Sequence, residues 1–167
     1  ADIAISVIHG KLTDGMKCIE LLRLPLILLV PKTISVKKLT DLIELDPDAT
    51  HPRGQSAPMR AKIPLVGLPV HETIQQIFQK KISDMNLNWD VSVEVNSLDV
   101  VQSYVSRGFG AGLSVAIPGL EENTHGCNVI PLDDFPPLII GAIYQGSLKP
   151  IAEQFLNETS HYANTLK

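Results

Sequence analysis

Strand-like and helix-like apolar patterns alternate along this chain, and this alternation constrains the fold more than any other feature. A short apolar run at Ile63–Leu68 leads into a helical pattern that ends near Met85. Valines then alternate with polar residues over Val91–Val95, as in a strand, before a helical pattern that Ser97 can cap. Strands and helices alternating at this spacing predict an α/β fold with mainly parallel pairing.

The first of these helices is predicted to be amphipathic. Its two faces consist of Ile74, Ile77, Phe78, Ile82 and Met85 on one side and Gln75, Gln76, Gln79 and Lys80 on the other. Gly108 closes the second helix, because glycine readily adopts the left-handed conformation found after helix ends. The middle of the chain therefore holds two successive strand-helix pairs.

Further elements are predicted on both sides of these pairs. Strands are predicted at Asp2–Ile8, Ile19–Leu22, Leu26–Val30, Leu113–Ile117, Val129–Leu132 and Leu138–Tyr144. A helix is predicted from Ser35, as its N-cap, to the Asp46-Pro47 step. The proline-containing segment Asp48–Lys62 is predicted to be a surface loop, and Pro118–Gly126 is predicted to be a polar turn.

A final helix is predicted near the end of the sequence. Ser147 can cap it, and Pro150 falls in its first turn, where the missing N–H costs nothing. Its predicted apolar stripe consists of Ile151, Ala152, Phe155, Leu156, Tyr162 and Leu166.

Size and charge narrow the classes of protein to which this chain can belong. With 167 residues, the chain can form one domain or two small lobes. Its longest apolar stretch, Leu24–Val30, contains Pro25 and is far shorter than the roughly 20 residues of a membrane span. The net charge of −4 disfavours sequence-independent DNA binding by this chain alone. We therefore expect a folded protein with neither a membrane span nor a DNA-binding surface of its own.

The first residues predict a chain that begins inside a buried strand. No initiator Met, turn or signal-like segment precedes the strand in this sequence, so we expect a fragment whose sheet lacks some of its strands. Cys18 and Cys127 are too few and too far apart for a disulfide framework, and buried reduced thiols are expected. Such thiols are consistent with the cytoplasm.

Motifs for catalysis, cofactors and metals are present only as fragments. Gly108–Gly112 is similar to part of a dinucleotide fingerprint, but it follows a helix and precedes a strand, the reverse of the order that binds phosphate. Ser114 lies within a predicted strand, and no histidine has a partner at metal-ligand spacing. The carboxylate pairs Glu121-Glu122 and Asp133-Asp134 lie in polar loops as solvated charge. We expect no enzyme activity, no cofactor and no metal.

Polar residues follow two of the predicted strands at the points where helices begin. His71, Glu72 and Thr73 come after the strand at Leu65–Leu68, and Asn96-Ser97 comes after Val91–Val95. The carboxyl ends of parallel strands are where open α/β folds bind ligands, and free N–H donors there favour anions. Helix capping alone would also explain Ser97 and Thr73. For His71, capping explains less.

Three stretches of this sequence resemble a known family. Asp2–Ile5, Leu24–Pro31 and above all Val95–Pro118 resemble the effector-binding domain of LysR-type transcriptional regulators. The last stretch is the most specific, since the family has a helix ending in Val-x-x-Gly-x-Gly, followed by a strand and a proline. The closing strand and helix also look like the C-terminal elements of the family.

The resemblance implies a fold and a domain division. The fold is that of type 2 periplasmic binding proteins: two α/β lobes with mixed, mainly parallel sheets, joined by crossover strands. Leu21–Asp134 would form effector-binding subdomain II, and Ala1–Glu20 with Phe135–Lys167 would form part of subdomain I. The family's winged helix-turn-helix and first βαβ portion would precede Ala1 in an intact regulator.

The resemblance also implies a binding site and a mechanism. A small-molecule effector would bind in the cleft between the lobes. Its predicted contacts are Ser6, Ile8, His9, Pro69, His71, Glu72, Thr73, Asn96 and Ser97. Effector binding would shift a conformational population without bond-making, acting on promoter DNA through the separate N-terminal domains of a cytoplasmic homo-oligomer, a dimer or tetramer. Because Glu72 would repel a carboxylate, either its side chain points away or the ligand is neutral or cationic.

Two other classes of protein share this two-lobed fold. An extracytoplasmic solute-binding protein of a transporter would need a signal peptide or a lipid anchor upstream, and the Arg107–Pro118 stretch argues against it. An enzyme such as a deaminase or dehydratase would need a nucleophile or an acid/base set, which the sequence does not supply. The LysR-type sensor is therefore the preferred prediction, with no cofactor, no metal and no membrane partner.

Overall fold

The computed structural model describes residues 3–55, 57–117, 126–146 and 150–166, which form two compact units. The first unit contains the described residues of Ala1–Pro25 and Pro137–Lys167. The second contains the described residues between them, apart from the short stretch that begins at Ala116. Predicted segments at 118–125 and the predicted cap at Ser147 lie outside the described residues.

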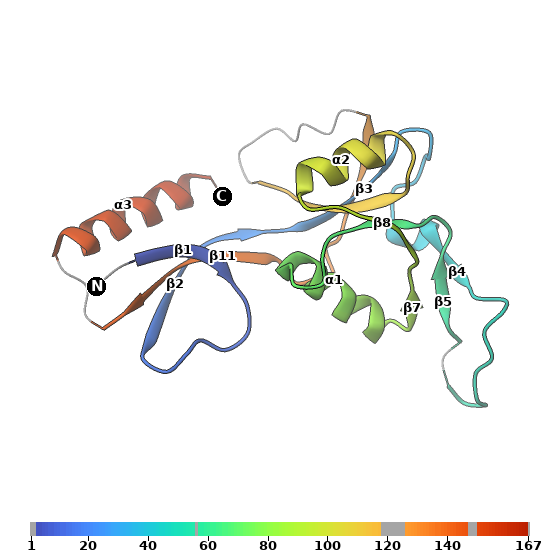
Figure 1. Ribbon diagram of the computed structural model, residues 1–167, viewed down its shortest axis with the longest axis horizontal. Helices are drawn as coiled ribbons and strands as arrows, with labels where there is room; N and C mark the ends of the chain where they lie inside the picture. The colour runs from blue at the N-terminus through green and yellow to red at the C-terminus, as the bar shows by residue number, and fades with distance from the viewer. Residues whose placement is uncertain (1–2, 56, 118–125, 147–149, 167) are drawn as a thin grey trace. The chain divides into compact units, whose positions relative to one another are not determined.

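The first unit is an antiparallel sheet with one helix (Figure 1). Its elements are β1 (Ile3–Ile8), β2 (Met16–Leu24), β11 (Leu138–Gln145) and α3 (Pro150–Thr165), and the strand order is β1-β11-β2. Leu21, Ala142, Leu156 and Ala163 form its core. The predicted division at Leu21 falls within β2, which pairs with β11 as far as Leu24.

Two details of this unit correct the sequence analysis. The strand β1 is mostly exposed rather than buried, and Ile5 keeps 49% of its surface accessible, because β1 is an edge strand with β11 as its only partner among the described strands. On α3, Leu156 faces the core as predicted and Ala163 joins it, whereas Phe155 and Tyr162, also predicted on the apolar stripe, are exposed. The seven-residue spacing of the two aromatic residues puts both on one face, and that face points away from the sheet.

The second unit is built on a five-stranded sheet with the order β10-β3-β9-β6-β8. The elements of this sheet and its helices are β3 (Leu26–Pro31), β6 (Leu65–Gly67), α1 (Thr73–Asp84), β8 (Val91–Glu94), α2 (Leu98–Ser106), β9 (Ala111–Val115) and β10 (Cys127–Pro131). A smaller sheet consists of β4 (Ile43–Leu45), β5 (Met59–Ala61) and β7 (Leu87–Asn88).

The α/β class is confirmed, but antiparallel pairs outnumber parallel ones among the described strands. In the large sheet, β6 pairs in parallel with β8 and β9, whereas β3 and β10 are antiparallel to their neighbours. The reason is connectivity, since parallel neighbours need a crossover and, in the part of the chain that the structure describes, only α1 and α2 supply one within this sheet. The expectation of mainly parallel sheets was wrong.

Each helix of the second unit has its own contact with the core. The side chains of Ile74, Phe78 and Ile82 from α1 are buried, and the Phe78 ring stacks on Phe135 with centroids 5.5 Å apart. The helix α2 crosses β9 so closely that a Cβ on Gly112 would lie 2.3 Å from Cγ1 of Val101. Gly112 is therefore required for this close packing.

Two predictions for residues 35–62 were wrong. The predicted helix from Ser35 to Asp46 is a single 3-10 turn, η1 (Leu39–Leu42), followed by β4. Ile43, which falls inside the expected helix, instead pairs with Ala61, because Met59–Ala61 forms a strand inside the expected loop. Local propensity could not reveal this pairing between segments distant in sequence. No helix in the described residues is long and apolar enough to cross a membrane.

Candidate functional site

The carboxyl ends of β6 and β8 lie next to each other, as the sequence predicted. Gly67 is opposite Glu94, and the Val95 N–H donates to the Gly67 carbonyl at 2.9 Å. The loops that lead into α1 and α2 therefore start side by side. This edge of the sheet brings together the predicted residues of the second unit, which are Pro69, His71, Glu72, Thr73, Asn96 and Ser97.

At the start of α2, a side chain already occupies a backbone donor. Ser97 is the N-cap, and its hydroxyl accepts a hydrogen bond from the Val100 N–H at 3.4 Å. Asp99 adds a negative charge in the first turn, where it stabilises the positive end of the helix dipole. The capping role of Ser97 is confirmed, and Asn96 beside it is exposed.

The start of α1 has a different arrangement. Glu72, not Thr73, is the N-cap, and among the described residues no side chain caps this helix. The Glu72 Oε1 atom lies 3.6 Å from Nε2 of His71, and both side chains reach solvent. The first-turn N–H groups of α1 are thus available to a ligand, and they form a potential anion-binding site.

Two glutamines of α1 hold the loop in front of the helix. Gln75 is 6% exposed, and its Oε1 accepts the Leu68 N–H at 3.2 Å. Gln76 donates from Nε2 to the Val70 carbonyl at 3.0 Å. Gln75 was predicted to lie on the polar face of this helix, and its burial is a correction. Its three- and seven-residue spacing to Phe78 and Ile82 was a signal that it shares their buried face.

The predicted residues of the first unit lie on or just after β1. Ser6 and His9 are exposed, and Ile8 is half-buried. A Cβ on Gly141 would lie 2.8 Å from Cγ1 of Ile8, so Ile8 packs on β11. Ser6, Ile8 and His9 therefore belong to a unit separate from the edge residues, and their role in binding stays a prediction.

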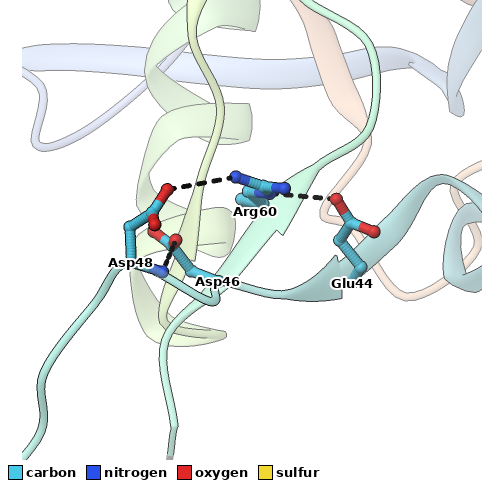
Figure 2. A network of polar contacts seen from close by, with 4 residues as sticks. All are labelled: Glu44, Asp46, Asp48 and Arg60. Atoms are coloured by element: carbon cyan, nitrogen blue, oxygen red, sulfur yellow. Dashed lines mark hydrogen bonds and ion pairs between the residues drawn. The ribbon is translucent and has the colours of Figure 1, made fainter.

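A hollow lies near the amino-terminal ends of β6 and β8, between α1 and the β4–β5 hairpin. It has a volume of about 690 Å³, and its lining includes Asp46, Asp48, Arg60 and Asp90. The Arg60 Nε donates to Glu44 Oε1 at 2.9 Å, and its Nη1 lies 3.7 Å from Asp48 Oδ2 (Figure 2). The hydrogen bond to Glu44 raises the pKa of Arg60, which stays a cation. The contacts with Glu44 and Asp48 thus explain the position of Arg60 without a ligand.

The described residues offer little for covalent or metal chemistry. No group of three or more His, Cys, Asp or Glu side chains in this part of the protein could hold a metal ion. Both cysteines are free, and burial raises the pKa of the Cys127 thiol. A raised pKa disfavours the nucleophilic thiolate. The chemistry that the second unit supports best is ligand binding at the carboxyl ends of β6 and β8.

Comparison with known proteins identifies the fold. No family model matches the sequence, and no curated protein matches it. HinK, a LysR family transcriptional regulator from Pseudomonas aeruginosa, superposes with a TM-score of 0.72 at 17% identity over 99% of this chain and 53% of HinK. This chain therefore spans about half the length of HinK.

Two structures with bound ligands are also similar. The effector-binding domain of QuiR in complex with shikimate has a TM-score of 0.71 at 12% identity, over 98% of this chain and 72% of that domain. The effector-binding domain of BenM with benzoate has a TM-score of 0.68 at 15% identity, over 98% and 69%. The resemblance to LysR-type effector-binding domains is confirmed at the level of the fold.

Proposed function

We propose that this chain is the effector-sensing part of a LysR-type transcriptional regulator and that it binds a small carboxylate without chemical conversion. The observation that carries the proposal is the uncapped start of α1 at the shared carboxyl edge of β6 and β8. First-turn N–H groups bind carboxylate oxygens well because the helix dipole adds a positive potential. Shikimate and benzoate, the ligands of QuiR and BenM, are both carboxylates.

Glu72 at this edge can be reconciled with an anionic ligand. Its Oε1 atom lies 3.6 Å from Nε2 of His71, so the carboxylate is directed toward the imidazole ring. Thr73, the first residue of α1, adds a hydroxyl beside the free N–H groups. We therefore propose His71 and Thr73 as ligand contacts, with Glu72 orienting His71.

The remaining parts of the proposal come from the family resemblance. Pro69, Asn96 and Ser97 would contribute further contacts from the second unit, and Ser6, Ile8 and His9 from the first. Leu21–Asp134 would act as subdomain II, with the rest as part of subdomain I. The protein would work in the cytoplasm as a homo-oligomer, and promoter DNA would contact a separate N-terminal segment.

An NMR titration with benzoate and shikimate tests the proposed site. We expect saturable shifts of the Thr73, Ile74 and Gln75 backbone amides, and at least a fivefold loss of affinity in Thr73→Val. Thr33→Val is the matched control, because Thr33 is exposed beyond the far end of β3. Equal losses in both variants, or shifts that avoid the start of α1, would count against this site.

The coding DNA upstream of the Ala1 codon tests the regulator role separately. A helix-turn-helix followed by an amphipathic linker helix is expected. In that longer protein, Thr73→Val should abolish the response to effector and leave DNA binding intact. A cleavable signal sequence at that position would instead identify a solute-binding protein of a transporter.

A further inference from the structure

The outer face of α1 carries a small pocket that the proposed effector site does not use. Its volume is about 270 Å³, and it is lined by Val70, Gln75, Gln76, Gln79, Lys80 and Ser83. The five lining residues from α1 follow helical spacing, and Val70 comes from the loop before it. None of the residues proposed as effector contacts lines this pocket.

Gln75, whose side chain is largely buried, gives the pocket a hydrogen-bond donor that no described residue accepts. The side chain is 6% exposed, and its Oε1 is committed to the Leu68 N–H. No described residue accepts a hydrogen bond from its Nε2. Fully buried polar atoms without partners are absent from the described side chains, so this Nε2 keeps contact with solvent. This N–H is therefore free to donate to a ligand oxygen.

The loop side of the pocket is held in place before any ligand arrives. Gln76 donates to the Val70 carbonyl, and the Glu72 N–H donates to the Pro69 carbonyl at 2.9 Å. Val70 is 81% exposed, so its methyl groups offer an apolar wall. A site that is preformed in this way avoids part of the entropy cost of ordering on binding.

The charge of the lining residues determines the kind of ligand that this pocket favours. Lys80 is the only charged residue among those that line the pocket. An ammonium group and an amide N–H together favour a carboxylate, whose oxygens accept hydrogen bonds from both. The pocket exceeds the roughly 150 Å³ that an apolar cavity needs to hold benzene, so an acid with a short apolar body fits.

We infer that this pocket binds a small monocarboxylate, with Gln75 Nε2 and Lys80 Nζ as donors and Val70 against the apolar part. The site lies on α1 next to the loop that Gln75 and Gln76 hold. It differs from the proposed effector site in its donors, which are the Gln75 and Lys80 side chains and not the first-turn backbone N–H groups.

Butyrate, butyramide and butylammonium form a series that tests this inference. The readout is the side-chain NH₂ resonance pair of Gln75 in NMR spectra of the whole chain. We expect saturable shifts with butyrate, weaker binding of butyramide, and binding of butylammonium at least tenfold weaker than that of butyrate. Equal affinities of butyrate and butylammonium would overturn the inference.

Two variants separate this site from the start of α1. Lys80→Ala should lower the affinity for butyrate at least fivefold and leave the affinity for butyramide unchanged. Lys17→Ala on β2 serves as the control for a lost surface charge. Gln75→Leu should weaken butyrate binding at least fivefold, as followed by the side-chain NH₂ resonances of Gln76 and Gln79, with Lys80→Ala deciding the question where Gln75→Leu fails to fold. Shifts confined to the Thr73 and Ile74 backbone amides would place butyrate at the helix start and refute this pocket.

Discussion

The starts of α1 and α2 follow neighbouring parallel strands at one edge of the sheet, yet their donors are satisfied differently. In α2, Ser97 caps the helix and Asp99 meets its dipole. In α1, Glu72 occupies the N-cap position without a capping hydrogen bond. Capping stabilises a helix by occupying the groups that an anion would use. The difference therefore separates a capped helix start from one whose first turn has no side-chain cap among the described residues, as the proposed binding site requires.

The open start of α1 needs support from elsewhere in the structure. Gln75 and Gln76 reach backward from the helix and hold the preceding loop through Leu68 and Val70. These bonds order the loop without using the first-turn N–H groups. The same helix is anchored farther along by Phe78, whose ring contacts Trp89 and Phe135. The comparison thus predicts that α1 depends on its core contacts and its glutamines, whereas α2 depends on its cap.

The largest effect is expected from Phe78→Ala, which removes the anchor of α1. Phe78 is fully buried, so the substitution should lower the free energy of unfolding by about 3–5 kcal/mol. Urea unfolding followed by the fluorescence of Trp89, the single tryptophan, measures this in the second unit. Phe155→Ala is the control, because Phe155 is 54% exposed. Similar losses in both variants would contradict the proposed anchor.

The next largest effect concerns the packing of α2 against β9. Gly112→Ala would place a methyl group 2.3 Å from Val101 Cγ1 and should destabilise by about 1–3 kcal/mol in the same urea experiment. In Gly67→Ala the new methyl group would lie 3.1 Å from Cγ1 of Val91, a side chain that is 52% exposed and can move. A larger loss for Gly67→Ala than for Gly112→Ala would show that α2 is not seated as closely as described.

The elements on either side of these two helices show what the sequence could and could not predict. Both helices, and the strands β6 and β8 before them, follow from local periodicity and from Ser97 and Gly108. The strand pair β4–β5 does not, because Ile43 and Ala61 are far apart in sequence and their pairing is a tertiary contact. The predominance of antiparallel pairs is likewise not visible in local patterns. It depends on which segments, distant in sequence, become neighbours in a sheet, as β3 does with β9 and β10.

The candidate site was predictable to a similar extent. The chain order of strand, polar residues and helix indicated that residues 71–73 and 96–97 lie at a carboxyl edge, and they do. The order could not indicate which helix would be capped, since serine and threonine hydroxyls at both starts looked equivalent. It also hid the role of Gln75, because glutamine is usually exposed and its burial depends on a hydrogen bond to a loop.

An intermediate effect is expected from Gln75→Leu, which tests the support of the open helix start. Leucine fills the space but leaves the Leu68 N–H without its acceptor, so we expect a loss of about 1–3 kcal/mol. Gln79→Leu, at an exposed position of the same helix, is the matched control. Hydrogen exchange of the Leu68 amide should accelerate only in Gln75→Leu. Unchanged exchange there would mean that the loop is ordered without Gln75.

The smallest effects come from exchanging the two kinds of helix start, and they test the comparison most directly. Ser97→Ala should cost about 1 kcal/mol by removing the cap of α2. Glu72→Ser should instead stabilise α1 by up to about 1 kcal/mol, because serine can accept a first-turn N–H that no described side chain now caps. The same cap would compete with an anion, so benzoate affinity should fall even though a negative charge has been removed. Tighter benzoate binding in Glu72→Ser would mean that charge repulsion, and not the availability of backbone donors, governs this edge.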